Sequence, residues 1–133
     1  MKNLLFLFLF IVTGLWSQAQ TGWIQVNSNL LAGQNVGQLS IGMNNPDALW
    51  AHAVDASGAI IDRWTKSADG GQTWTSGTFN AGTGLSMIFA ISETTCWAVF
   101  NTGAAQGLYK TVDGGTTWAK KGTAYSGSSF ANV

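Results

Sequence analysis

A nine-residue phrase that occurs twice constrains the fold of this chain more than any other feature of its sequence. Residues 66–74 read Lys-Ser-Ala-Asp-Gly-Gly-Gln-Thr-Trp, and residues 110–118, 44 positions later, read Lys-Thr-Val-Asp-Gly-Gly-Thr-Thr-Trp. A fixed period of this length is typical of repeat architectures, in which each repeat is one supersecondary unit that packs against its neighbours. The sequence therefore predicts similar structural units in succession.

The composition favours β-structure and argues against two classes of partner. The 133 residues include 17 glycines and one proline, and no segment has the apolar period of a helix. Many glycine turns between β-branched and aromatic residues are typical of all-β proteins. Only 9% of the residues are charged and the formal net charge is zero, which argues against nucleic acid or anionic lipid as a partner.

Alignment on the repeated phrase extends the similarity upstream and predicts four short strands in each unit. The strands of the first unit are expected around residues 40–43, 49–51, 60–66 and 74–79. Those of the second unit are expected around residues 87–90, 96–98, 108–111 and 118–125. Four short strands joined by turns are about the length of one β-propeller blade.

The blade boundaries and the chain ends complete the predicted architecture. Blade one is expected at about 38–79, blade two at about 85–125, and the start of blade three at about 130–133. Residues 22–27 resemble the strand that begins at Trp74, without the three strands that precede it, and we expect them to close a ring. A ring of about four to eight blades would cover the open sheet edges.

We therefore predict an all-β fold: two four-stranded antiparallel blades of an incomplete β-propeller plus an N-terminal closing strand. Residues 20–133 are expected to be a fragment of a longer protein. Ring closure would then need the missing C-terminal blades or self-association, because two blades alone leave sheet edges unpaired.

Residues 1–19 are predicted to be a signal peptide. Lys2 supplies a positive n-region, residues 4–12 are uninterruptedly apolar, and small residues precede a cleavage site before Gln20. The rival interpretation, a membrane anchor, requires a longer apolar segment. We expect bacterial export to a secreted, extracellular or cell-surface location, with no membrane insertion after cleavage.

Each residue of the repeated phrase has a structural role in a β-hairpin turn. Asp69 can accept hydrogen bonds from the backbone N–H groups that follow it. Gly70 and Gly71 permit a positive φ, and Ser67 or Thr111 can bridge to the turn through its hydroxyl. The tryptophan ring is expected to cover the hairpin, with a burial worth about 2–3 kcal/mol.

The two copies resemble Asp-box repeats, also called BNR repeats, of sialidases, sortilin-type propellers, xyloglucan-cleaving glycosidases and photosystem assembly factors. The residues that match are Ser67, Asp69, Gly71, Thr73 and Trp74, then Thr111, Asp113, Gly115, Thr117 and Trp118. The resemblance implies a structural, non-catalytic turn between the third and fourth strands, facing away from the ligand. It also implies a ligand face on the loops after the second and fourth strands, with the candidates Asp55, Ser57, Asn80, Asn101 and Gln106.

The acids and arginines needed for the catalysis of such families are scarce in this chain. A sialidase needs three arginines and a Tyr–Glu pair, whereas the sequence has one arginine, Arg63, and one glutamate, Glu93. We expect Arg63 to be structural. A glycosidase needs two carboxylates about 5–10 Å apart, for which Asp47 and Glu93, in equivalent loops, are candidates. The preference of acidic residues for turns explains the positions of both acids equally well.

The sequence contains no motif for a metal site or for a catalytic nucleophile. A calcium site needs several oxygen ligands in one loop, and Asp69 and Asp113 each stand alone. His52 is the single histidine, with no second His or nearby Cys to complete a zinc site and no accompanying serine motif for a catalytic triad. Cys96 is the single cysteine, which excludes an intrachain disulfide and predicts a small buried thiol. We predict no metal and no cofactor.

The favoured function is an extracellular binding or scaffold module for a glycan or a protein. The alternative is a truncated secreted glycoside hydrolase, sialidase- or xyloglucanase-like, whose catalytic residues lie in missing downstream blades. A third alternative is an assembly or adhesion protein that uses the side of the propeller. Whether the chain belongs to an enzyme stays open at this point.

Overall fold

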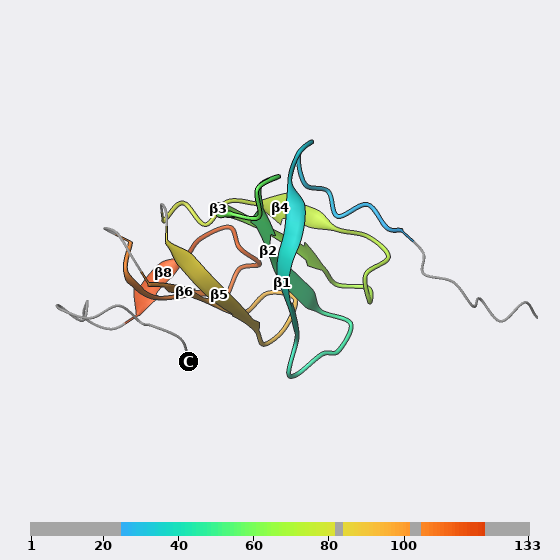
Figure 1. Ribbon diagram of the computed structural model, residues 1–133. Helices are drawn as coiled ribbons and strands as arrows, with labels where there is room; N and C mark the ends of the chain where they lie inside the picture. The colour runs from blue at the N-terminus through green and yellow to red at the C-terminus, as the bar shows by residue number, and fades with distance from the viewer. Residues whose placement is uncertain (1–24, 82–83, 102–104, 122–133) are drawn as a thin grey trace, which may run out of the picture.

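The computed structural model describes residues 25–81, 84–101 and 105–121 (Figure 1). Within these ranges the chain forms eight strands joined by turns, and it contains no helix. A search of the same residues found no helix long and apolar enough to cross a membrane. The predicted all-β class is therefore confirmed.

The strands form two four-stranded antiparallel sheets. Sheet one contains β1 (Asn35–Ile41), β2 (Leu49–Val54), β3 (Ile60–Ser67) and β4 (Thr75–Gly77). Sheet two contains β5 (Leu85–Ala90), β6 (Cys96–Phe100), β7 (Gly107–Thr111) and β8 (Ala119–Lys121). In both sheets the strands follow one another in chain order, so each unit of the repeat is one up-and-down sheet.

The first strand begins earlier than the sequence predicted. It starts at Asn35 instead of near residue 40, and Gly42 and Met43 lie beyond its end. A β-bulge between Val36 and Leu39 shifts its register against β2. A bulge interrupts the two-residue alternation from which a strand is recognised, and this explains why the sequence pattern missed the beginning of β1.

The expected closing strand is only partly described. Residues 25–27 belong to none of the eight strands, and residues 22–24 lie outside the described ranges, as do the expected signal peptide and residues 130–133. The segment that follows nevertheless contacts sheet one. The hydroxyl of Thr65 on β3 donates a hydrogen bond of 2.5 Å to the carbonyl oxygen of Ser28.

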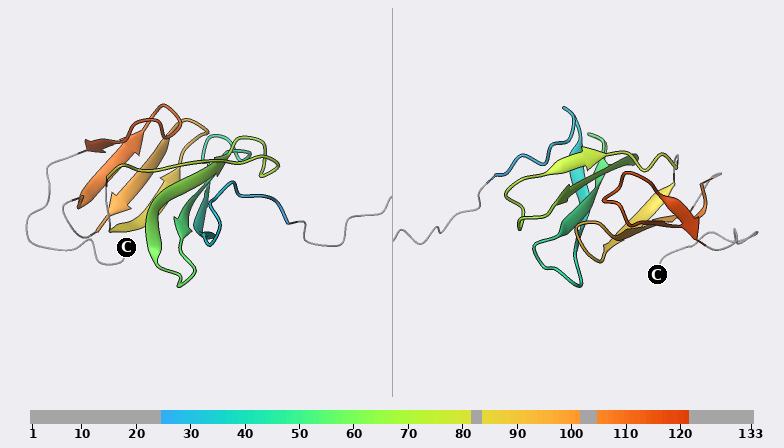
Figure 2. Two further views of the ribbon diagram at one scale, coloured as in Figure 1. Left: turned by 90° about the horizontal axis from the view of Figure 1, so that it is seen from above. Right: turned by 180° about the vertical axis from the view of Figure 1, so that it is seen from behind.

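The two sheets pack face to face as two layers (Figure 2). Strands β1, β2 and β3 all contact β5. Two side chains of β1 hydrogen-bond the edge of β5: Ser40 Oγ accepts from the N–H of Ala90 at 2.9 Å, and Gln38 Oε1 accepts from the N–H of Ile88 at 3.3 Å. These contacts satisfy backbone donors on an edge strand that would otherwise remain open.

The core between the sheets is aromatic. Its buried members are Trp50, Trp64, Phe79, Leu85, Ile88, Ala90, Cys96, Ala98, Phe100 and Ala105. Trp118, which follows β7, packs on Trp50 at 6.0 Å and on Phe79 at 4.8 Å between ring centroids. Phe79 in turn lies 5.7 Å from Phe100 of sheet two. A continuous row of rings therefore crosses the interface.

We expect Trp118→Ala to destabilise the protein far more than Trp74→Ala, although both residues end a copy of the same phrase. Removing Trp118 opens a cavity between the sheets and should lower the free energy of unfolding by about 3 kcal/mol. Trp74 has no ring partner among the described residues, so its loss should cost about 1 kcal/mol. Urea denaturation of the two variants measures the difference, and equal losses would contradict the assigned packing.

Candidate functional site

The first candidate site is the turn formed by residues 67–74, here called the first turn. The carboxylate of Asp69 closes it: Oδ1 accepts from the hydroxyl of Ser67 at 2.7 Å and from the N–H of Thr73 at 2.9 Å. The second oxygen, Oδ2, accepts from the hydroxyl of Thr73 at 2.5 Å. Ser67 Oγ accepts from the N–H of Gly71 at 2.8 Å. The turn thereby satisfies its own polar groups.

The second turn, residues 111–118, repeats this network. Asp113 Oδ1 accepts from the hydroxyl of Thr111 at 2.8 Å and from the N–H of Thr117 at 2.9 Å. Its Oδ2 accepts from the hydroxyl of Thr117 at 2.6 Å, and Thr111 Oγ1 accepts from the N–H of Gly115 at 2.9 Å. Sequence reasoning predicted the acceptor role of the aspartate and the hydroxyl bridge, and the contacts agree with both.

The glycines of the two turns adopt the left-handed conformation that the phrase predicted. φ is 70° and 95° at Gly70 and Gly71, and 73° and 90° at Gly114 and Gly115. Residues with a side chain rarely adopt such angles, so glycine is required where the chain reverses.

Hydrogen bonds hold both turn aspartates in the ionised form. Donation from the threonine hydroxyl, and then from the threonine N–H and the Ser67 hydroxyl, lowers the pKa of Asp69 to about 2. The corresponding donors from Thr117 and Thr111 lower the pKa of Asp113 to about 2. A carboxylate that is ionised near neutral pH and accepts hydrogen bonds from its own turn is poorly suited to act as a general acid there. Its role is structural.

The two tryptophans of the phrase differ in their contacts. Trp74 covers its own turn as expected, and its Nε1 donates to the carbonyl oxygen of Gly71 at 2.8 Å. Trp118 instead packs against Trp50 of sheet one, and its Nε1 is buried with no hydrogen-bond partner among the described residues. Sequence reasoning treated the two as equivalent and missed that the second connects the sheets.

The turns lie at one end of the sheets, beside the β1–β2 and β5–β6 loops. The N–H of Gly70 donates to the carbonyl oxygen of Asp47, and the N–H of Gly114 donates to that of Thr94, each at 2.9 Å. In an antiparallel sheet the β2–β3 and β6–β7 loops leave from the opposite end. The candidate ligand residues in those loops are therefore remote from the turns.

Most candidate ligand residues are engaged in their own loops. Asp55 Oδ1 accepts from the N–H of Ser57 at 2.8 Å and from its hydroxyl at 2.6 Å, and the hydroxyl contact is the main cause of the lowered pKa of Asp55. Asn80, with a φ of 53°, accepts from the hydroxyl of Thr78 at 2.8 Å. The N–H of Asn101 donates to Gly84 O at 2.8 Å, which joins two loops at this end. Gln106, before β7, is half-buried.

The carboxylate pair considered for glycoside hydrolysis lies at the turn end. Glu93 is an exposed residue of the β5–β6 loop, where its Oε2 accepts from Asn45 Nδ2 at 3.5 Å. Its backbone carbonyl accepts from Lys66 Nζ at 3.1 Å. Asp47 belongs to the neighbouring β1–β2 loop.

Other reactive groups are occupied or shielded in the described ranges. No group of three or more His, Cys, Asp or Glu residues gathers there as a metal site. Cys96 is buried as predicted, and burial raises the pKa of its thiol to about 12, which leaves it unreactive. Arg63, on β3, is half-buried.

His52 stabilises the bulge of β1. Its Nε2 accepts from the N–H of Gln38 at 3.1 Å, which assigns the ring proton to Nδ1, next to the carbonyl oxygen of Ala53. A Cβ on Gly37 would overlap the His52 ring, so glycine is needed at this position. Burial lowers the pKa of His52. The side chain therefore has a structural role in the neutral form.

Comparisons with known proteins give no match. No protein-family model matches the chain, no curated protein is detectably similar to it, and no solved structure matches it. Function is therefore inferred from the geometry of the chain itself.

Alanine at the second glycine of each turn should give unequal losses of stability. At Gly71 the added Cβ makes ordinary van der Waals contacts, with Leu49 Cδ1 at 3.4 Å and Trp74 Cζ2 at 3.7 Å, so the positive φ alone should cost about 1 kcal/mol. At Gly115 the Cβ would also overlap the ring of Trp64 of sheet one, and the loss should reach about 2–4 kcal/mol. Chemical denaturation of both variants measures these values. A larger loss for Gly71→Ala would refute the packing of the second turn on sheet one.

Stability should fall as the pH drops below about 6.5, the ordinary pKa of histidine. Because the folded-state pKa of His52 is lowered, the unfolded chain binds a proton in this range before the folded chain does. The turn aspartates, with a pKa of about 2 against 3.8, contribute only at lower pH. Free energies of unfolding between pH 5 and 8 test this, and His52→Gln should abolish the slope. A slope that persists in that variant would assign it to another group.

Proposed function

We propose that this chain is part of an Asp-box β-propeller that serves as an extracellular binding or scaffold module for a glycan or a protein. The observation that carries the proposal is the duplicated turn network, in which Asp69 and Asp113 make the same hydrogen bonds at the same end of successive sheets. The polar groups that the two copies of the phrase share are thus engaged in structural hydrogen bonds.

The arrangement of the sheets supports the propeller. Each sheet is an antiparallel meander of four strands, and the first strands of both, β1 and β5, lie beside each other. In a propeller the first strand of each blade lines the central axis, and successive blades pack face to face. The contacts of Ser40 and Gln38 with β5 agree with such a position.

The loops opposite the turns supply the proposed ligand face. The Asn101–Gly84 hydrogen bond connects the β6–β7 loop with the chain entering β5, and the β2–β3 loop is held by Asp55. A loop that is fixed by its own hydrogen bonds, as the β2–β3 loop is, suits recognition by hydrogen bonds, because little order must be gained on binding. The extracellular location rests on the predicted signal peptide, residues 1–19.

The test is a glycan array that includes sialylated and xyloglucan oligosaccharides, probed with the secreted chain, together with an assay on aryl glycosides. We expect retention of a glycan without hydrolysis. Asn101→Ala and Gln106→Ala should weaken binding by about tenfold each, the usual effect of losing an interface contact of about 1.4 kcal/mol. Gln72→Ala, in the first turn at the opposite end, should leave the affinity unchanged.

The contrary outcomes are distinct. Hydrolysis of an aryl glycoside would replace the binding module with the alternative, a secreted glycoside hydrolase. Binding that Gln72→Ala weakens and the loop variants leave intact would move the ligand face to the turn end. Absence of both glycan binding and hydrolysis would restrict the proposal to a protein ligand.

A further inference from the structure

His52 is a buried titratable group at the contact between β1 and β2. Its side chain is 4% exposed, and its Nε2 accepts from the N–H of Gln38 at 3.1 Å. A protonated imidazole carries a hydrogen on both ring nitrogens, so it can only donate. Protonation of His52 would therefore set two hydrogen-bond donors against each other at a position that is largely closed to water.

The His52 ring has little room to turn away from Gln38. On one side it packs against Gly37, where even an added Cβ would overlap the ring. Across the sheet it pairs with Trp64 of β3, which is itself buried. The extra proton is then accommodated most readily if β1 moves away from β2.

Sheet two forms a bulge at the equivalent place of β5 without a histidine. The apolar pairs on either side of the bulge correspond in the two registers, which matches Gly37, Gln38 and His52 with Ser86, Met87 and Val99. None of these three residues of sheet two titrates. The bulge thus does not need an imidazole for its shape, and His52 adds a dependence on protonation that the second copy lacks.

Gln38 connects the bulge of β1 to the other sheet. Its N–H is held by His52, and its side-chain Oε1 accepts from the N–H of Ile88 on β5 at 3.3 Å. Gln38 is an exposed residue, and an exposed side chain has many competing conformations. Its bond to Ile88 therefore depends on a bulge backbone that is held in place, and loss of the His52 contact also weakens a contact between the sheets.

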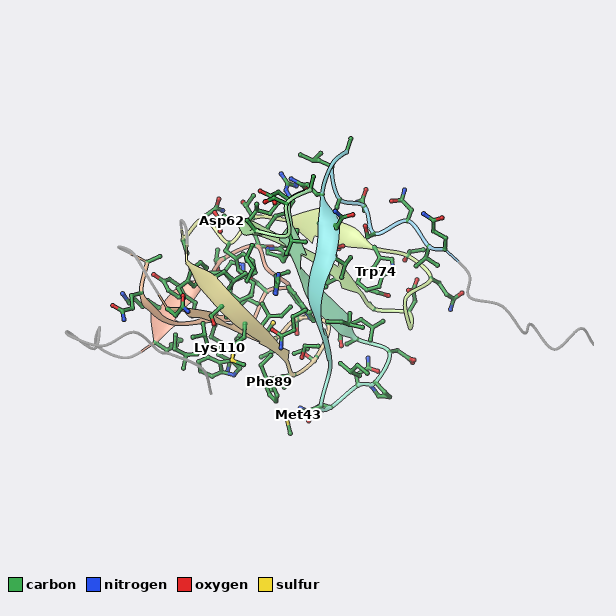
Figure 3. The ribbon with its side chains drawn as sticks, in the orientation of Figure 1. Met43, Asp62, Trp74, Phe89 and Lys110 are labelled. Atoms are coloured by element: carbon green, nitrogen blue, oxygen red, sulfur yellow. The ribbon has the colours of Figure 1, made fainter. Side chains whose placement is uncertain are left out.

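The other end of β1 is fastened by separate hydrogen bonds. The N–H of Ala90 on β5 donates to Ser40 Oγ at 2.9 Å. Figure 3 shows Met43, which follows β1, together with Phe89 of β5 at this end, where the N–H of Met43 donates to the carbonyl oxygen of Ala90 at 3.4 Å. Strand β1 is thus held to β5 at two places, and one of them does not involve the histidine.

Charged groups near His52 are confined to β3. Strands β1, β2 and β5 contain no Asp, Glu, Lys or Arg, whereas β3 contains Asp62, Arg63 and Lys66. Burial lowers the pKa of His52, and the hydrogen bond to the carbonyl oxygen of Ala53 opposes this effect. Neither cause is a charged group, so the protonation of His52 is governed by the closure of the bulge around it.

We propose that His52 is a pH-sensitive latch on β1: its protonation releases the bulge from β2 and frees the hydrogen bond between Gln38 and β5, while the Ser40 end of the strand stays bound. The latch is closed when His52 is neutral and opens in acid. The end that opens lies next to the β2–β3 loop, which begins at Asp55. Acidification therefore acts first on this end of the two sheets.

The test is native-state hydrogen exchange of the full chain, followed by NMR between pH 7.5 and 4.5 at low urea concentrations. The N–H groups of Gln38 and Ile88 report on the latch, and that of Ala90 reports on the other end of β1. After correction for the chemical step, the opening that exposes Gln38 and Ile88 should become up to about tenfold more populated per pH unit below 6.5, the limit for one proton. This opening should not depend on urea, whereas Ala90 should be better protected and exchange through urea-dependent unfolding.

Variants at position 52 provide matched controls. His52→Gln keeps a hydrogen-bond acceptor that does not titrate, so Gln38 and Ile88 should stay protected and lose the pH dependence of their opening. His52→Val introduces the residue of sheet two and removes the acceptor, so both N–H groups should exchange rapidly at every pH. Asp62→Asn, which neutralises the carboxylate of β3, should keep the pH profile of the unmodified chain.

The contrary results are specific. Gln38 and Ile88 that share the protection and urea dependence of Ala90 at every pH would overturn the latch, because His52 would then act on the whole fold. A response of Gln38 without Ile88 would disconnect the bulge from β5. A pH dependence that persists in His52→Gln and disappears in Asp62→Asn would assign the proton to the carboxylate. If a variant does not fold, the pH series of the unmodified chain, with Ala90 as its reference, decides alone.

Discussion

The packing of Trp118 on Trp50 is the contact on which the arrangement of the two sheets depends. The ring comes from the end of the second turn, and it lies 6.0 Å from Trp50 and 4.8 Å from Phe79, between ring centroids. A small antiparallel sheet has an apolar face that it cannot bury by itself. Trp118 lets one sheet bury part of the face of the other, so the stability of each unit depends on its neighbour.

The turn networks make this contact possible. Asp113 fixes the backbone of residues 111–117 through short hydrogen bonds, and the glycines allow the chain to reverse within that space. A turn closed by its own side chains holds the following tryptophan in a defined position. The polar groups of the phrase thus support an apolar contact, and they are not available for chemistry on a ligand.

Sequence reasoning reached the features that depend on local contacts. The hydrogen bonds of Asp69 join atoms within four residues, so their residue types and spacing were sufficient to predict them. The beginning of β1 depends on His52, 14 residues from Gln38, and the role of Trp118 depends on Trp50 of the other sheet. Such long-range contacts leave no local pattern. The candidate ligand residues also could not be evaluated from sequence, because the internal bonds of Asp55 appear only in the folded loop.

Repetition has a consequence for the surface as well as for the core. In a repeat array, a sheet packs on the preceding sheet through one face and on the following sheet through the other, so its two faces are complementary. In sheet two, Trp97 and Lys110 repeat the pair that Trp50 and Lys66 form in sheet one, with the lysine Nζ at 5.1 and 5.0 Å from the ring centroid. The β5–β6 loop covers the pair of sheet one through hydrogen bonds to Trp50 and Lys66, whereas Trp97 is half-buried. The same local pair therefore differs in burial because of the element that packs on it.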